Sequence, residues 1–351
     1  MNAIQWLELT VMQEEKLLMT QWRIPGSGQR MRNRTPVFIL MIFVGLLLVG
    51  CTPKEGTEKE MSMNDLSIQA NLVFFYYKDL EGAQHFYEDI IGLEMVLDYG
   101  FAKLFRISQT SYIGLVDEKK GMHSADEPKT VTLSFVTEEI DDWYNYLVEK
   151  EVEMRGPLKD ATRHPTRGFV AYDPEGYFLE FERFLDHSQN EKLLKRLSQY
   201  EAVYPSADAK ASRPKNLGIQ ANIVWLYYRD LEEAQRFYED VFGFGLQVDQ
   251  GFAKVYTCSP TAYVGLVDEA QGLHRFTEKK AVTLSFISEH IDEWYSLLLS
   301  KELKMRDDLA DSERIPVRAF VSFDIAGYFL EFDRFLPHED NSKILRYLQK
   351  H

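Results

Sequence analysis

The sequence has few cysteines and no excess of positive charge. Only two of its 351 residues are cysteines, Cys51 and Cys258, and neither has a second cysteine or a histidine at a zinc-ligand spacing. This count excludes a disulfide framework. The formal net charge of −15 argues against a nucleic-acid partner, because phosphate binding needs a surface rich in Lys and Arg.

Common catalytic motifs are also missing. The sequence contains no phosphate-binding glycine loop and no dinucleotide-binding fingerprint. No Ser-His-Asp or Cys-His constellation can be assembled from it. Catalytic residues therefore stay unassigned at this stage.

Long apolar runs are absent except for one near the N-terminus. Residues 35–49 are almost entirely apolar, Arg32 and Arg34 precede them, and Gly50 and Cys51 follow. Positive charge before a short apolar segment is typical of a secretory signal, and the run is short for a membrane span. The end of the run, "LVGC", resembles the lipobox of bacterial lipoproteins. This resemblance implies lipidation of Cys51 and a lipid-anchored location in the bacterial cell envelope, outside the cytoplasm.

An uncleaved N-terminal anchor helix is the alternative for this segment. Residues 1–30 fit no signal peptide and are interpreted as an over-called start, since Met31 would begin a signal of normal proportions. We assign residues 31–50 to the signal peptide and 51–66 to a flexible tether, because the latter segment is charged and has no aromatic residues.

The rest of the chain consists largely of an internal sequence repeat. "DPEGYFLEFERF" at 173–184 returns as "DIAGYFLEFDRF" at 324–335, an offset of 151 residues. Residues 67–187 align with 218–338 at this offset without a gap, and about half of the positions are identical. A period of this length is the size of a domain. The sequence therefore predicts two domains, 67–187 and 218–338, with a helix and linker at 188–217 and a C-terminal helix at 339–351.

Each copy contains the same order of elements twice. Residues 71–77 are β-branched and aromatic and predict a strand, and Asp79 and Gly92 are placed to begin and end an amphipathic helix. Three short strands are predicted next. The pattern then starts again with a strand at 130–136 and another amphipathic helix. The predicted order is strand, helix and three strands, twice in each copy.

Two phrases in each copy identify a family. "YYKDLEGAQHFYEDIIGLEM" resembles the opening of the vicinal oxygen chelate family, which includes glyoxalase I, bleomycin-resistance proteins and extradiol dioxygenases, and "YDPEGYFLEF" resembles its closing strand. The resemblance implies an α+β fold of two tandem domains, each with two βαβββ modules around a cup-shaped cavity. Because family members often pair modules across a dimer, we expect an internal pseudo-dimer whose cups can mix modules from both copies.

In metal-dependent members of the family, ligands come from the first and fourth strands of each module, typically His or Gln, Glu, His and Glu. The ion acts there as a Lewis acid. Alignment on Asp79 places the following residues at these positions in the two copies: Leu72 and Ile223, Gly114 and Gly265, Thr132 and Thr283, Glu180 and Glu331. Only the glutamates can serve as good ligands, so no cofactor is expected. A divalent metal at Glu180 or Glu331 is the alternative, and a one-residue bulge would bring Asn71 to it.

The cup face of the first strand is aromatic instead. Phe74 and Tyr76 share the side of the lost ligand position, as do Trp225 and Tyr227 in the second copy. An aromatic slot with a few polar groups is typical of a pocket for a small organic molecule. With Thr132, Thr283, Glu180 and Glu331 these four are the main ligand-binding candidates. The alternative is that the aromatic rings pack together and fill the cup.

A second group of candidates is kept in both copies. His123 and His274 lie in a loop and can act as acid or base near a cup. Arg163 and Arg314 can clamp an anionic ligand. The group is completed by Asn71 and Asn222. Solvent exposure of the charged residues and hydrogen bonding at strand ends by the asparagines are the alternatives.

The sequence therefore favours a membrane-anchored exported protein that binds a small organic molecule without a catalytic metal, as bleomycin-resistance proteins do by sequestration. One alternative is a metal-dependent lyase, isomerase or dioxygenase of the same family. Another is an envelope scaffold whose cups are packed.

Overall fold

The computed structural model describes residues 66–205 and 211–350. The predicted signal peptide, the lipidation site Cys51 and all but the last residue of the predicted tether lie outside these ranges. Within them, no helix is long and apolar enough to cross a membrane.

Each copy forms two βαβββ modules, as predicted. The first copy contains β1 (Ala70–Tyr77), α2 (Leu80–His85) continued by the π turn η2 (Phe86–Ile90), β2 (Glu94–Asp98), β3 (Ala102–Arg106) and β4 (Ser111–Asp117), then β5 (Val131–Val136), α3 (Ile140–Glu149), β6 (Lys159–Asp160), β7 (Thr166–Tyr172) and β8 (Phe178–Phe184). The second copy contains β9 (Ala221–Tyr228), α5 (Leu231–Phe242), β10 (Gly245–Asp249), β11 (Ala253–Ser259) and β12 (Ala262–Asp268), then β13 (Val282–Ile287), α6 (Ile291–Ser300), β14 (Met305–Asp311), β15 (Val317–Phe323) and β16 (Phe329–Phe335).

Local chemistry sets the helix ends. The Asp79 and Asp230 side chains accept hydrogen bonds from the backbone N–H of Gly82 and Glu233, each at 2.9 Å, and so cap α2 and α5. Helix α5 ends at Gly243, whose φ of 67° is the left-handed conformation that glycine adopts without strain. The strand-to-helix corner of a module is therefore specified by its own sequence.

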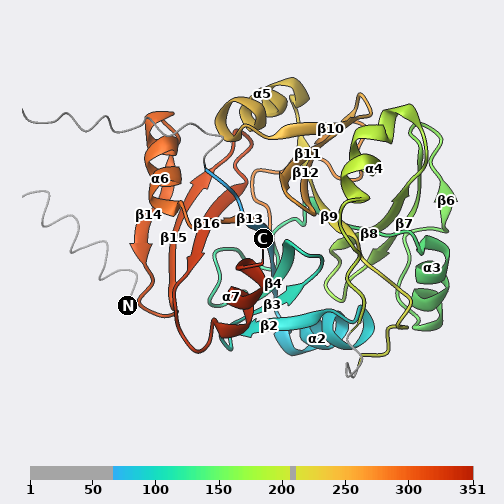
Figure 1. The fold of residues 1–351 in the computed structure, drawn as a ribbon, viewed down its shortest axis with the longest axis horizontal. Coiled ribbons are helices and arrows are strands. Elements are labelled where there is room, and N and C mark those ends of the chain that lie inside the picture. Colours follow the sequence, from blue (N-terminus) through green and yellow to red (C-terminus); the bar gives the residue numbers. More distant parts are fainter. Residues whose placement is uncertain (1–65, 206–210, 351) are drawn as a thin grey trace, which may run out of the picture. The chain divides into compact units, whose positions relative to one another are not determined.

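The two eight-stranded sheets are built across the repeat. Their strand orders are β14-β15-β16-β13-β1-β4-β3-β2 and β10-β11-β12-β9-β5-β8-β7-β6. The first module thus shares a sheet with the fourth, through antiparallel β1 and β13, and the second with the third, through antiparallel β5 and β9. Figure 1 shows this exchange, with blue β1 beside orange β13. Segments 67–187 and 218–338 are repeats of sequence, and each sheet takes half of its strands from each.

The contact between the copies is internally symmetric. Thr110 and Thr261, which are equivalent at the 151-residue offset, bond to each other through their hydroxyls at 2.9 Å. Ser259 donates to Thr110 at 2.8 Å, and the hydroxyls of its equivalent, Ser108, and Thr261 are also 2.8 Å apart. The predicted pseudo-dimer therefore has its two-fold axis near these hydroxyl groups.

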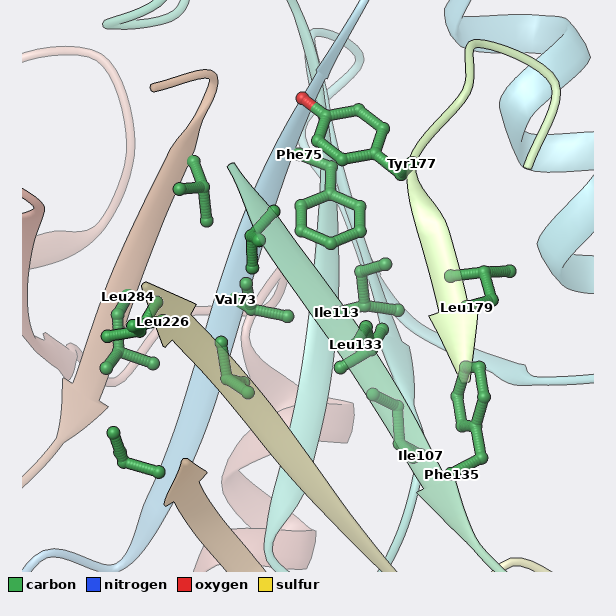
Figure 2. Close-up of a cluster of buried hydrophobic side chains, with 14 of the residues drawn as sticks. Val73, Phe75, Ile107, Ile113, Leu133, Phe135, Tyr177, Leu179, Leu226 and Leu284 are labelled. Carbon is green, nitrogen blue, oxygen red and sulfur yellow. The ribbon is translucent and has the colours of Figure 1, made fainter. Parts of the chain in front are cut away.

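The faces of the sheets that point away from the cups share one hydrophobic core. Figure 2 shows Val73, Phe75 and Leu284 from one sheet near Leu133 and Leu226 from the other, and all five are fully buried. The Tyr177 ring stacks on Phe75 with 3.9 Å between centroids. Its hydroxyl donates to the Ala281 carbonyl at 2.6 Å, so a residue of the first copy is fixed to the second.

Two short helices follow the modules. Helix α4 (Glu191–Leu197), preceded by the single turn η3 (Ser188–Asn190), ends the first copy, and α7 (Ser342–Leu348) ends the second. Their apolar residues face the concave sides of the sheets.

Candidate functional site

Each sheet has one concave face, and the two faces form two cups. Cup A is bounded by Phe74 and Tyr76 of β1 and by Glu331 of β16. Cup B is bounded by Trp225 and Tyr227 of β9 and by Glu180 of β8. The predicted aromatic pair and the predicted glutamate thus meet in both cups, but each pair meets the glutamate of the other copy.

Alternation along β1 places the candidates as predicted. Leu72 and Phe74 belong to the apolar cluster on the concave face, whereas Val73 and Phe75 belong to the core between the sheets. The pairing of β1 with β4 is continuous from Asn71 onward and contains no bulge. The side chains of β1 therefore alternate between the cup and the core in the order that the sequence predicts.

One end of each cup is covered by a helix. Ile344 and Leu348 of α7 are buried in the same cluster as Leu72, and Leu193 and Leu197 of α4 in the same cluster as Ile223. On the cup A side, Glu94 of β2 accepts a hydrogen bond from Tyr347 at 2.7 Å and pairs with Lys343 at 2.9 Å. The first-strand ligand positions of the family, Leu72 and Ile223, therefore lie in packed regions.

The fourth-strand ligand positions are occupied by neighbouring rings. A Cβ added at Gly114 would overlap the Phe74 ring, and one added at Gly265 would overlap the Trp225 ring. Each ring fills the space where a ligand side chain from the fourth strand would stand. In the described parts of the chain, no group of three or more His, Cys, Asp or Glu side chains is arranged to hold a metal ion.

Thr132 and Thr283 support the tyrosines and do not border either cavity. The Tyr76 and Thr283 hydroxyls are 2.7 Å apart, and so are those of Tyr227 and Thr132. Both threonines are fully buried. Each threonine hydroxyl holds a tyrosine from the other copy, and the expectation that the threonines contact a ligand stays a prediction.

The space that remains in cup A is about 170 Å³ and mostly aromatic. Its walls include the rings of Phe74, Tyr76, Tyr99, Phe101 and Phe335. The aromatic rings therefore do not fill cup A completely, contrary to the alternative considered above. The cavity in cup B is smaller, about 140 Å³, and more polar, with His164, Gln250 and Gln271 among its lining residues.

A pair of carboxyls forms part of each cavity wall. In cup A these are Glu331 and Asp333, two residues apart on β16 and hence on one face. Asp333 accepts a hydrogen bond from Ser285 at 2.5 Å. Burial raises the pKa of Asp333 to about 7. Burial, and then the charge of Asp333, raise the pKa of Glu331 well above its ordinary value.

Cup B repeats this arrangement with Glu180 and Glu182. Glu182 accepts a hydrogen bond from Ser134 at 2.5 Å, and burial raises its pKa to about 7. Burial and the charge of Glu182 raise the pKa of Glu180 well above its ordinary value. Neither cup can hold both of its carboxyls ionised at neutral pH without a cost in free energy.

The candidate histidines pack behind the tyrosines. His123 lies between Tyr76 and Phe329, with ring centroids 5.0 and 4.2 Å away, and its Nδ1 is 2.7 Å from Glu127. Burial lowers the pKa of His123. His274 is placed equivalently, and burial lowers its pKa to about 4. Both rings are therefore neutral at pH 7 and stabilise the cup wall, and neither borders a cavity.

The candidate arginines lie at the cup rims. The Arg163 guanidinium is 4.4 Å from the centroid of the Phe252 ring and donates to the Gln271 side chain at 3.2 Å. Arg314 lies 4.5 Å over Phe101. Each arginine thus connects two modules across a cup mouth.

Asn71 and Asn222 are not among the residues that line the two cavities, and their role as ligand contacts stays a prediction. Both lie on the opposite face of their strands, because strand parity is unbroken, and both are fully buried. Neither side-chain amide has a hydrogen-bond partner within the described residues.

Sequence reasoning missed several residues of the site. Arg155 and Arg306 lie near the cup glutamates and oppose the rise in their pKa values. They are equivalent at the 151-residue offset, so their retention in both copies was the available signal. Tyr99 of cup A corresponds to Gln250 in cup B, and no repeat signal marks it.

Comparisons with known proteins agree with this fold. Residues 69–181 match the family model described as the Glyoxalase/Bleomycin resistance protein/Dioxygenase superfamily. No curated protein matches the chain. Among solved structures, a putative dioxygenase from Bacillus subtilis is similar with a TM-score of 0.56 and 13% identity over 80% of this chain and 90% of its own. Glyoxalase I from Zea mays is similar with a TM-score of 0.53 and 12% identity over 81% and 95%.

At these identities the structural likeness concerns the fold alone. It covers both copies, and the family match falls on the first, which the second repeats at an offset of 151 residues. Residues 69–181 therefore match the Glyoxalase/Bleomycin resistance protein/Dioxygenase superfamily, and the two copies together have the fold of two α+β domains in tandem.

Proposed function

We propose that this protein binds small, partly aromatic or hydrophobic organic molecules in its cups, without a catalytic metal. The observation that carries this proposal is the position of Phe74 over Gly114 and of Trp225 over Gly265. Each ring replaces a ligand-bearing side chain and at the same time becomes part of a cavity wall. Enclosed, largely apolar cavities with a few polar groups are typical binding sites for organic ligands.

The donor set supports the metal-free part of the proposal. A catalytic divalent ion needs about three protein ligands and an open position. At the four family positions cup A has Leu72, Gly114, Thr283 and Glu331, and the threonine is bonded to Tyr76. The one carboxylate at these positions, with Asp333 beside it already accepting a hydrogen bond from Ser285, falls short of that ligand set. The same holds for cup B with Glu180.

Elemental mass spectrometry and a ligand screen test this function. We expect less than about 0.1 equivalent of Fe, Mn, Ni or Zn per chain after incubation with each ion and removal of the excess. A screen of one- and two-ring compounds by thermal shift is expected to give ligands that raise the Tm. Variants Phe74→Ala and Trp225→Ala are expected to lose this response for cup A and cup B ligands respectively.

One or two equivalents of metal, lost in Glu180→Gln and Glu331→Gln, would instead favour the metal-dependent lyase, isomerase or dioxygenase. Failure of every compound to raise the Tm would favour the scaffold alternative.

We also propose that the protein is lipid-anchored in the bacterial envelope through Cys51. The motif "LVGC" behind an apolar segment supports this location. Cys51→Ser is expected to prevent lipidation, which mass spectrometry of the N-terminal peptide detects. An unmodified Cys51 in the native membrane fraction would contradict the anchor.

A further inference from the structure

The wall of cup A carries more negative than positive charge. The ionisable groups around Glu331 are Asp333 on its own strand, Asp307 and Arg306 on β14, and Tyr76 on β1. Tyr76 stays neutral because burial raises its pKa far above the physiological range. Arg306 and Asp307 are exposed and lie outside the cavity lining, so the two carboxyls Glu331 and Asp333 face the cavity and the guanidinium nearest to Glu331 does not.

That guanidinium is already engaged. Arg306 forms an ion pair with Asp307, its neighbour in sequence. Within the described residues the Glu331 carboxyl has charged neighbours but no side-chain hydrogen-bond partner, so it is available to a ligand. Two cations near the mouth, Lys120 and Arg314, lie at the solvent side, where water and salt screen their charge.

Cup B provides an internal comparison. The residue equivalent to Asp307 is Gly156, so Arg155 has no acidic neighbour at that position and its charge is left to oppose that of Glu180. His164 takes the place of Ile315 at the rim. The guanidinium nearest to Glu180 therefore has no acidic neighbour in sequence, whereas the one nearest to Glu331 is paired with Asp307.

The remaining walls of cup A suit a flat cation. Phe74, Tyr99, Phe101 and Phe335 present rings to the cavity, and the face of an aromatic ring attracts ammonium groups. The cavity is about 170 Å³, whereas a cavity of about 150 Å³ in another protein accommodates benzene. The space thus fits one aromatic ring with a short substituent.

We propose that cup A takes a one-ring arylalkylamine in its protonated form, with the ammonium group beside Glu331 and the ring among Phe74, Phe101 and Phe335. This inference deepens the proposed small-molecule binding and rests on it. The cation replaces the proton that the carboxyl pair retains in the empty cup. Binding therefore releases a proton, and the affinity increases as the pH rises from 6 to 8.

Benzylammonium is the probe, with benzyl alcohol as its neutral match and benzoate as its anionic match. Isothermal titration of each into the full-length chain at pH 7.5 is expected to show benzylammonium binding at least ten-fold tighter than benzyl alcohol, and no binding of benzoate. Glu331→Gln is expected to reduce the benzylammonium affinity at least ten-fold and to change that of benzyl alcohol less than two-fold. Glu180→Gln, the matched change in cup B, is expected to reduce the benzylammonium affinity much less than Glu331→Gln does.

Equal affinities for benzylammonium and benzyl alcohol, with both lost in Phe74→Ala, would overturn the cation proposal and leave the binding function standing. Equal effects of Glu180→Gln and Glu331→Gln would overturn the assignment to cup A. Absence of binding by all three probes, together with a negative thermal-shift screen, would overturn both. An affinity that falls between pH 6 and 8 would also contradict the exchange of a proton for the cation.

Discussion

Gly114 and Gly265 each lie directly beneath an aromatic ring of the neighbouring strand. The ring can take this place only because glycine has no side chain there. A large aromatic residue on one strand thus occupies the space that a large polar residue on the next would take, and this part of the cup wall stays packed. It also changes what the cup can hold, since a ring offers dispersion and cation contacts in place of an electron pair for a metal.

Gly114→Ala is therefore expected to lower the free energy of unfolding by about 1–3 kcal/mol, because the added methyl group forces the Phe74 ring to move. In the Phe74→Ala background the same change is expected to cost less than about 0.5 kcal/mol. Urea denaturation of the double-mutant cycle measures the difference. Gly156→Ala is the control, since no atom lies within 4 Å of a Cβ added there. If Gly114→Ala lowered the free energy of unfolding equally with Phe74 and with Ala at position 74, the added methyl group would not be clashing with the Phe74 ring.

The buried carboxyls make stability depend on pH. Their folded pKa values are raised, to about 7 for Asp333 and Glu182, while unfolded carboxyls ionise near pH 4. Between these values each of these carboxyls binds more protons in the folded state than in the unfolded state, so its contribution to the free energy of unfolding falls as the pH rises from about 4 to about 7. Above pH 7 this contribution levels off.

Asp333→Asn is expected to reduce this slope and to raise the free energy of unfolding at pH 8 by about 1–2 kcal/mol, because the amide needs no proton to stay neutral. Urea denaturation at pH 5.5 and pH 8 measures both quantities. Asp126→Asn, at an exposed position, serves as a control with little effect on the slope. A wild-type stability that rises from pH 5.5 to pH 8 would contradict the prediction.

Two short helices reshape the cups at the scale of the element. Helices α7 and α4 were predicted from amphipathic patterns, but nothing in those patterns indicates where the apolar face goes. In the structure that face covers the end of each cup where the first-strand ligand of the family would lie. The helices thus turn an open cup into a shorter, more enclosed cavity.

Ile344→Ala in α7 is expected to lower the free energy of unfolding by about 2–4 kcal/mol, because the side chain is fully buried against the cup A sheet. Leu299→Ala is the control, since Leu299 is 47% exposed and its truncation is expected to cost less than about 0.5 kcal/mol. Similar costs for the two variants would show that α7 does not depend on its cup contact.

At the scale of the whole molecule, both sheets need strands from both copies. Each eight-stranded sheet joins a module of the first copy to a module of the second through β1 with β13 or β5 with β9. A single copy would leave both of these strands with an unpaired edge. Exposed edges of this kind promote association with another chain.

Residues 66–205 produced alone are therefore expected to form a dimer, in which β1 of one chain pairs with β5 of the other. Size-exclusion chromatography with light scattering measures the mass. The full-length chain, with its pairing satisfied internally, is the control. A well-folded monomer of residues 66–205 would contradict the requirement for the second copy.

The sequence by itself determined the modules. Strand and helix signals, the caps at Asp79 and Asp230, and the alternation of Leu72, Phe74 and Tyr76 are local properties that need no knowledge of distant partners. The repeat and the family phrases determined the fold class in the same way. The position of Glu180 and Glu331 on the cup face also follows from this local alternation.

Only the tertiary structure decided which modules share a sheet. All four modules present similar pairing edges, so pairing within a copy or across copies satisfies the same local patterns, and the difference lies in contacts far apart in sequence. The bond between Tyr76 and Thr283, the cover of Leu72 by α7 and the excess charge at Glu331 all follow from that choice. Which side chains meet in a cup therefore depends on which modules share a sheet, because every cup combines side chains that lie more than 40 residues apart in the sequence.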